Sequence, residues 1–127
     1  MRLLLDTQIF LWCLDQTPRM PAIVRQALED TDNAILVSAA ALWEIAIKTS
    51  KGRLKIPAAD LRRLTRLIEA MGFEELPVLA RHAAAVHALP WHHRDPFDRL
   101  MIAQARDESL TLATVDPAIR AYDVSVL

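Results

Sequence analysis

The chain has 127 residues, a formal net charge of −1 and 53% hydrophobic residues, with only two glycines. This length allows one domain with a sizeable core, so we expect a single domain spanning 1–127. The composition excludes a disordered chain, and the net charge gives no overall attraction to nucleic acid. The lone Cys13 allows no internal disulfide, and no apolar stretch reaches membrane-span length. We therefore expect a cytoplasmic protein.

Short apolar runs alternate with helical patterns along the chain. In chain order we predict a strand at 2–5, helices at 7–14 and 21–30, a strand at 34–37, helices at 39–51 and 60–71, an edge strand at 73–78, helices at 79–89 and 96–108, a strand at 110–114, a helical turn at 116–122 and a strand at 124–127. The strand runs are apolar throughout rather than alternating, which is typical of a parallel sheet. We predict an α/β fold of three layers (α/β/α) with a central, mostly parallel sheet of four or five strands.

Three aspartates are expected at one edge of this sheet. Asp6 directly follows the first strand, Asp116 follows the strand 110–114, and Asp98 falls in the first turn of the helix that begins at Pro96. Helices that follow parallel strands begin at the same edge of a sheet, where binding sites form. Each aspartate is equally explained as a helix cap, because a carboxylate there accepts free N–H groups. Asp95, directly before Pro96, is the expected cap of its helix.

Glu44 is the only polar residue between positions 39 and 47. A buried carboxylate needs a partner. One partner is Lys48, four residues on and in the favoured order. The other is a cation held in a cleft with the aspartates, whose charges would otherwise repel each other. Oxygen ligands of this kind select Mg²⁺ or Mn²⁺, and such a cluster can activate water for displacement at phosphorus.

Four stretches carry a resemblance to a known family: "LLLDTQIFLW", "SAAALWEIAIKTSKGRL", "RDPFDRLMIAQA" and "LATVDPAIRAY". Their order and spacing resemble the PIN domain, and specifically the VapC-type toxins of bacterial toxin–antitoxin pairs, over essentially the whole chain. The resemblance implies a metal-dependent endoribonuclease in which bound Mg²⁺ or Mn²⁺ activates the water that cuts RNA, and an antitoxin that blocks the site. The family's four acidic positions are occupied here by Asp6, Glu44, Asp98 and Asp116.

The resemblance also suggests supporting roles. Small hydroxyl residues often stand beside the family's acids, and here the residues at those positions are Thr7, Ser38 and Thr114. Seven basic residues and one acidic residue lie between positions 48 and 66, which indicates either a local basic surface or ordinary solvated helices. The candidate contacts to RNA phosphates are Lys48, Lys51, Arg53 and Arg99. For Arg99, pairing with Asp95 or another acid is the alternative.

Several other interpretations remain. A phosphate-accepting signalling domain would need paired acids after the first strand, but Asp6 is followed by Thr7. A non-catalytic PIN module that binds protein or RNA stays open.

The histidines at 87, 92 and 93 match no compact zinc motif and are expected in surface loops. Trp43 is expected in the core and Trp91 at a partner surface, and the apolar N-terminal helices predict a homodimer.

Overall fold

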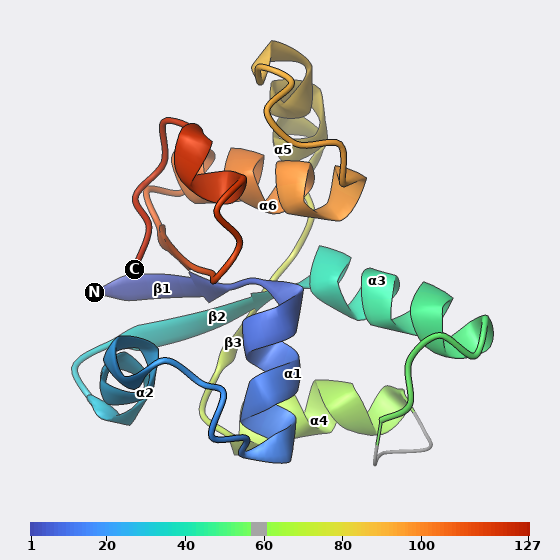
Figure 1. Ribbon diagram of the computed structural model, residues 1–127, viewed down its shortest axis with the longest axis vertical. Helices are drawn as coiled ribbons and strands as arrows, with labels where there is room; N and C mark the ends of the chain where they lie inside the picture. The colour runs from blue at the N-terminus through green and yellow to red at the C-terminus, as the bar shows by residue number, and fades with distance from the viewer. Residues whose placement is uncertain (57–60) are drawn as a thin grey trace.

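The computed structural model describes residues 1–56 and 61–127 of the chain. In chain order its elements are β1 (Arg2–Leu5), α1 (Thr7–Asp15), α2 (Ala22–Glu29), β2 (Ala34–Ser38), α3 (Ala39–Ser50), α4 (Arg62–Ala70), β3 (Glu74–Leu76), α5 (Ala80–Ala85), the 3₁₀ helix η1 (Val86–Ala88), α6 (Pro96–Asp107), β4 (Thr111–Ala113) and the 3₁₀ helix η2 (Ile119–Ala121). The predicted alternation of strands and helices is confirmed (Figure 1).

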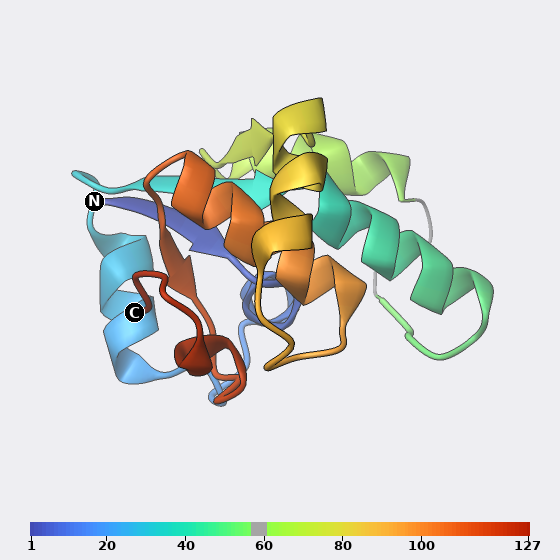
Figure 2. The ribbon, with the colours of Figure 1, turned by 90° about the horizontal axis from the view of Figure 1, so that it is seen from above.

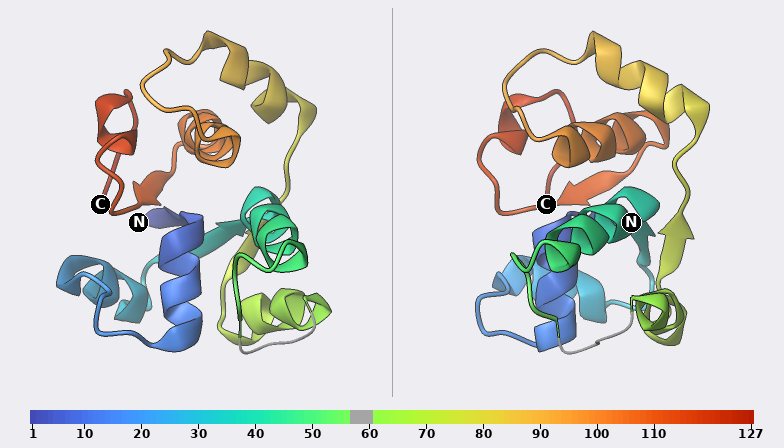
Figure 3. Two further views of the ribbon diagram at one scale, coloured as in Figure 1. Left: turned by 45° about the vertical axis from the view of Figure 1, so that its right-hand side comes forward. Right: turned by 90° about the vertical axis from the view of Figure 1, so that its right-hand side faces the viewer.

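The four strands form one parallel sheet in the order β3-β2-β1-β4. Helices α1, α2 and α4 lie on one face of it, and α5 and α6 lie on the other (Figures 1 and 3). The three-layer α/β/α fold is therefore confirmed. Helix α3 extends beyond the carboxyl ends of the strands instead of covering a face (Figures 1 and 2). Beside β1 the strand order reverses, and this is where parallel sheets open a crevice for ligands.

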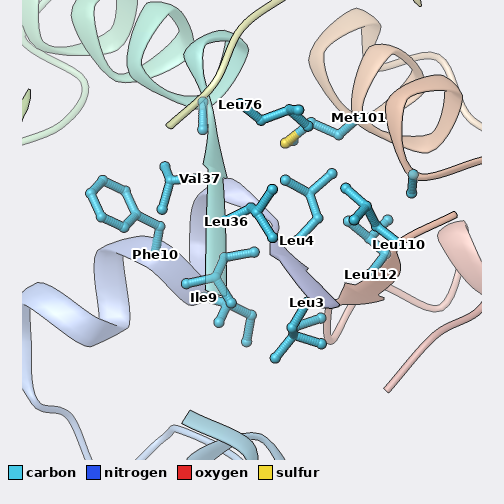
Figure 4. Packing of buried hydrophobic residues seen from close by; sticks show 14 of the residues in the cluster. Leu3, Leu4, Ile9, Phe10, Leu36, Val37, Leu76, Met101, Leu110 and Leu112 are labelled. Atoms are coloured by element: carbon cyan, nitrogen blue, oxygen red, sulfur yellow. The ribbon is translucent and has the colours of Figure 1, made fainter. Parts of the chain in front are cut away.

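Successive residues of the inner strands are buried on opposite faces of the sheet. Val37 points toward Phe10 of α1, whereas its neighbour Leu36 points to the other side with Leu4 and Met101 of α6 (Figure 4). All five side chains belong to the buried hydrophobic core. Because both faces are covered by helices, the inner strands are apolar at consecutive positions, 3–5 in β1 and 34–37 in β2, which explains the unbroken apolar runs in the sequence.

The helix ends follow the predicted signals. Ser38 caps α3 by accepting a hydrogen bond from the backbone N–H of Ala40. Gly52 and Gly72 follow α3 and α4 with φ of 69° and 75°, a left-handed conformation that glycine adopts without strain. Among the described residues, no helix combines the length and apolar character needed to cross a membrane.

Some predicted boundaries were wrong. The segment 124–127 forms only an isolated bridge, Leu112 to Val126, because β4 itself is three residues long. The helix predicted at 79–89 is split into α5 and η1, and the turn at 116–122 contains only η2. Helix α4 begins at Arg62, and the predicted start at position 60 lies outside the described residues.

Candidate active site

The carboxyl ends of three neighbouring strands lie at the same level. The register of β1 with β2 and β4 brings Asp6, Ser38 and Thr114 to one edge of the sheet. Asp6 is buried, and its backbone N–H continues the pairing by donating to the carbonyl of Ala113 at 3.1 Å. The sheet itself therefore fixes where the first acid of the site lies.

Asp6 acts as a helix cap and also faces other acids. Its Oδ1 accepts a hydrogen bond from the N–H of Ile9 at 2.8 Å, which caps α1. Burial raises the pKa of its carboxyl, the hydrogen bonds from Thr114 and Ile9 oppose this, and the charges of Asp116 and Glu44 raise the pKa further. Capping therefore does not exclude a role in an acidic cluster.

Ser38 and Thr114, expected beside the acids, have distinct contacts. The hydroxyl of Ser38 donates to Gln104 of α6 at 2.6 Å in the interior, in addition to capping α3. The hydroxyl of Thr114 accepts the backbone N–H of Asp116 at 3.0 Å and is close enough to Asp6 to lower the pKa of that carboxyl. Ser38 thus joins α3 to α6, whereas Thr114 links the acids at positions 6 and 116.

Glu44 points inward from α3 and is only 4% exposed. Its Oε1 accepts a hydrogen bond from the Thr7 hydroxyl at 2.6 Å, and its Oε2 pairs with the Lys48 ammonium at 2.6 Å. The predicted pair with Lys48 therefore exists. The charge of Glu44 also raises the pKa of both Asp6 and Asp98, so the same carboxylate belongs to the acidic cluster.

We expect Glu44→Gln to lower the free energy of unfolding by less than about 1 kcal/mol while removing stabilisation by Mn²⁺. The Lys48 side chain is 47% exposed, and ion pairs open to solvent contribute little to stability. Thermal unfolding with and without Mn²⁺ measures both effects. Lys48→Gln is the matched control, because it breaks the same pair but keeps the carboxylate and the response to Mn²⁺. An unchanged response to Mn²⁺ in Glu44→Gln would rule out Glu44 as a ligand.

The N-terminus of α6 supplies two aspartates with different roles. Asp95 is the N-cap, as predicted: its Oδ1 accepts the N–H groups of Phe97 and Asp98 at 2.9 and 3.0 Å. Asp98 faces the cluster. Burial and the charges of Asp95, Asp6 and Glu44 raise the pKa of its carboxyl to about 7, against an opposing effect of His93.

His93 is a site residue that the sequence did not reveal. Its Nε2 lies 2.9 Å from Asp98 Oδ2 and 3.0 Å from Asp116 Oδ2, so it bridges the two carboxylates. The other oxygen of Asp116 accepts the N–H of Ala118 at 2.9 Å. The prediction of a surface-loop histidine was wrong for His93, which is half-buried. Its position two residues before the cap of α6 was the available signal, since that loop must reach the same edge of the sheet.

The raised pKa of Asp98 predicts a pH dependence of stability in the metal-free protein. The pKa of this carboxyl is about 7 in the folded chain against an ordinary value of 3.8, so folding favours its protonated form. The contribution to stability is full below pH 4 and is lost as the pH rises through 7. Urea unfolding with a chelator at pH 5 to 8 should show wild type losing more stability than Asp98→Asn over this range. Parallel pH profiles for the two proteins would contradict the assigned shift.

The predicted phosphate contacts fall into two groups. Lys48, Lys51 and Arg53 lie at the C-terminal end of α3, where Lys51 and Arg53 are exposed. Lys48 is close enough to the cluster for Asp95 and Asp98, together with its partner Glu44, to raise the pKa of its ammonium.

Arg99, by contrast, is not available to a phosphate. It is 3% exposed, and it does not pair with Asp95. Its guanidinium donates to four oxygens, which are the backbone carbonyls of Val86, Leu89 and Pro90 and the hydroxyl of Tyr122. The flat face of the guanidinium stacks on the Trp91 ring, with Arg99 Cζ 3.9 Å from the ring centroid. The expected RNA contact is therefore corrected: Arg99 fastens the loop before α6 to the interior.

The four acids fit a hard divalent cation. Asp6 lies between β1 and α1, Glu44 lies in α3, Asp98 in α6 and Asp116 in the loop after β4, and their charges act on one another. Oxygen-rich sites of this kind prefer Mg²⁺ or Mn²⁺. Two groups of described residues have ligand atoms close enough to hold one ion: His93 with Asp98 and Asp116 in this cluster, and His82 with Asp107 and Glu108 at the other end of α6. There both carboxylates already pair with the same Arg81 guanidinium, which compensates part of their charge.

Comparison with known proteins identifies the family. The fold of this chain is similar to that of VapBC2 from Rickettsia felis bound to a DNA fragment from their promoter (TM-score 0.74, 15% identity, covering 100% of this chain and 98% of that chain). It is also similar to FitAcB from Neisseria gonorrhoeae (0.62, 23%, 98% and 96%) and to VapBC-1 from nontypeable Haemophilus influenzae (0.68, 16%, 100% and 97%). No curated protein matches the sequence. The model of the PIN domain family matches residues 3–125, and the chain therefore belongs to the PIN domain family.

Proposed function

We propose that this chain is a metal-dependent endoribonuclease and the toxin of a toxin–antitoxin pair. The observation that carries the proposal is the convergence of four carboxylates at the carboxyl ends of the parallel strands, in a chain whose family is one of nucleases. Similarity to the PIN domain endonuclease Utp24 (TM-score 0.53, 16% identity, 94% of this chain and 74% of that chain) is consistent with a hydrolase.

In this proposal, Asp6, Glu44, Asp98 and Asp116 hold Mg²⁺ or Mn²⁺. The bound cation supplies Lewis acidity, which lowers the pKa of water and offsets the charge that develops at phosphorus. The chain's own groups orient the ligands. The Thr7 hydroxyl donates to Glu44, and the backbone N–H of Ile9 donates to Asp6, so each of these two buried carboxylates is held in place. Hydrolysis adds water to a backbone phosphate and breaks one phosphorus–oxygen bond of the RNA.

The RNA backbone would run along the basic end of α3. Lys51 follows Glu44 by seven residues, which is about 10 Å along a helix axis. Arg53 lies just beyond, and its backbone N–H is tied to the carbonyl of Lys48 at 2.9 Å. Phosphates on one side of the cut can therefore meet positive charge while the cleaved one faces the acids.

We further infer a protein partner and a place of action. The similar structures carry the name VapBC, and together with the resemblance to VapC-type toxins this supports a cognate antitoxin for this chain. A homodimer remains our prediction, because half-buried apolar residues of α1 such as Leu11 and Trp12 leave surface for self-association. An enzyme of this kind would act in the cytoplasm, where RNA is present.

The proposal is tested by incubating the purified chain with total cellular RNA. We expect discrete fragments with Mn²⁺ or Mg²⁺ and none when the cation is chelated. Single-stranded DNA of matched sequence serves as the control for specificity. Binding of RNA without cleavage at any cation concentration would instead identify a non-catalytic PIN module.

A further inference from the structure

The histidine between two acids of the site has a defined chemical role that rests on the proposed function. His93 Nε2 contacts one carboxylate oxygen of Asp98 and one of Asp116, at 2.9 and 3.0 Å. An imidazole in this place can do one of two things. It can ligate the cation through an unprotonated Nε2, or it can donate the Nε2 proton to the carboxylates. The two roles require opposite protonation of Nε2, so the rest of the ring decides between them.

The other ring nitrogen faces only donors. His93 Nδ1 accepts the backbone N–H of Arg94 at 3.0 Å and lies 3.4 Å from the backbone N–H of Asp95. A backbone amide cannot lose its proton, so Nδ1 carries none. In a neutral imidazole the proton is then on Nε2, pointing at the two carboxylates. A doubly protonated ring would place an Nδ1 proton against these amides.

The backbone of His93 is also held in place, which fixes the position of the ring. The N–H of His93 donates to the hydroxyl of Tyr122 at 2.9 Å, and Tyr122 is buried. The same hydroxyl accepts a hydrogen bond from Arg99 at 3.1 Å. The loop that carries His93 is thereby anchored to α6 and to the chain after β4. These are the two segments that carry Asp98 and Asp116.

We propose that His93 is a positioning residue: its Nε2–H holds Asp98 and Asp116 together for the cation, and it is not itself a ligand. Asp98 belongs to α6, whereas Asp116 lies in the loop after β4, so nothing in the local sequence fixes their separation. One shared proton draws an oxygen of each carboxylate to the same point and offsets part of their mutual repulsion. Outer partners of this kind typically change metal affinity by about 10- to 100-fold.

Two measurements test this role. Long-range ¹H–¹⁵N NMR of the metal-free wild-type protein reads which nitrogen of His93 carries the proton, and we expect Nε2. Electron spin echo spectroscopy of bound Mn²⁺ reads directly coordinated nitrogen, and we expect none. An Nδ1–H tautomer would show that Nε2 donates no proton to the carboxylates. A ¹⁴N coupling in wild type that His93→Ala lacks would show that His93 is a ligand. Either result would overturn the proposal.

Variants measure the size of the effect. We expect His93→Ala to weaken Mn²⁺ binding, followed by electron paramagnetic resonance titration, about 10-fold or more. His93→Gln keeps an N–H donor near the Nε2 position and should recover most of this loss. The control is His92→Ala, because His92 is exposed and makes only an edge contact with Tyr122. Wild-type affinity in His93→Ala would refute the positioning role.

These outcomes separate the role of His93 from the function on which it rests. If wild type and His93→Ala bind Mn²⁺ equally and both cleave RNA, the positioning role is wrong and the ribonuclease stands. If wild type neither binds Mn²⁺ nor cleaves RNA, the ribonuclease itself is wrong, and the role of His93 is overturned with it.

Discussion

Asp98→Asn is expected to abolish metal-dependent RNA cleavage, with a loss of at least about a hundredfold. Ligands that place a cation at a phosphoryl group lower the barrier to cleavage by several kcal/mol, and each 1.4 kcal/mol changes the rate about tenfold. The substitution keeps the size of the side chain. The N–H groups at the start of α6 also stay capped, since their acceptor is Asp95. We therefore expect a folded protein, checked by circular dichroism, that no longer cuts RNA when initial rates are measured.

The matched control for this variant is Asp95→Asn. Asparagine caps helices as well as aspartate does, so the start of α6 should be preserved. The Asp95 Oδ1 accepts two backbone N–H groups, so we expect Asp95 to act as the cap. Loss of its negative charge in Asp95→Asn should therefore leave the rate of cleavage nearly unchanged. Cleavage by Asp98→Asn at the wild-type rate would contradict the assignment of Asp98. Loss of cleavage in Asp95→Asn alone would move the ligand role to Asp95.

Replacing Arg99 by methionine is expected to destabilise the protein by about 3–5 kcal/mol. Four oxygen atoms accept hydrogen bonds from its guanidinium; two of these bonds are buried and two are partly buried. Each buried acceptor left without a donor costs about 1–3 kcal/mol, and partial relaxation keeps the total below the full sum. Arg99→Lys should also destabilise, because one ammonium cannot satisfy four acceptors in this fork-like arrangement. Urea unfolding midpoints measure both effects.

Arg94→Met provides the control for this prediction. Arg94 is exposed in the same loop, and substitutions at such positions usually change stability by less than about 0.5 kcal/mol. If Arg99→Met unfolds at the same urea concentration as Arg94→Met, Arg99 does not fasten the loop. We also expect Arg99→Met to weaken cleavage, since the anchored loop carries His93 to the acids.

The sheet and the placement of the acids could be predicted because they depend on local signals. Unbroken apolar runs identified the inner strands, and Ser38, Gly52 and Gly72 marked helix ends that the structure confirms. The carboxyl-end rule for parallel sheets predicts that Asp6 lies near the other acids, and the effect of the Asp116 and Glu44 charges on its pKa agrees with this prediction. The strand predicted at 124–127 is only an isolated bridge in the structure, because the neighbouring strand β4 is three residues long.

The interior contacts of the site could not be predicted, because they join residues far apart in the sequence. Arg99 has the sequence context of a surface phosphate contact, yet it ends beneath a loop whose carbonyls it must satisfy. His93 bridges Asp98 and Asp116 only once α6 and β4 are side by side. Trp43 was expected in the core but is 60% exposed on α3, where it packs edge-on against Phe97. Its apolar sequence neighbours gave no indication of which helix face it occupies.

In our proposal, the carboxylates of Asp6, Glu44, Asp98 and Asp116 form a cation site and do not serve only as caps and salt-bridge partners. This proposal is tested most directly by growing crystals of the wild-type protein with Mn²⁺ and collecting anomalous diffraction at the manganese edge. We predict an anomalous peak bounded by the carboxylates of Asp6, Glu44, Asp98 and Asp116, with His93 outside the coordination shell. No peak at saturating Mn²⁺, or a peak confined to His82, Asp107 and Glu108 at the far end of α6, would show that the four acids do not bind the cation.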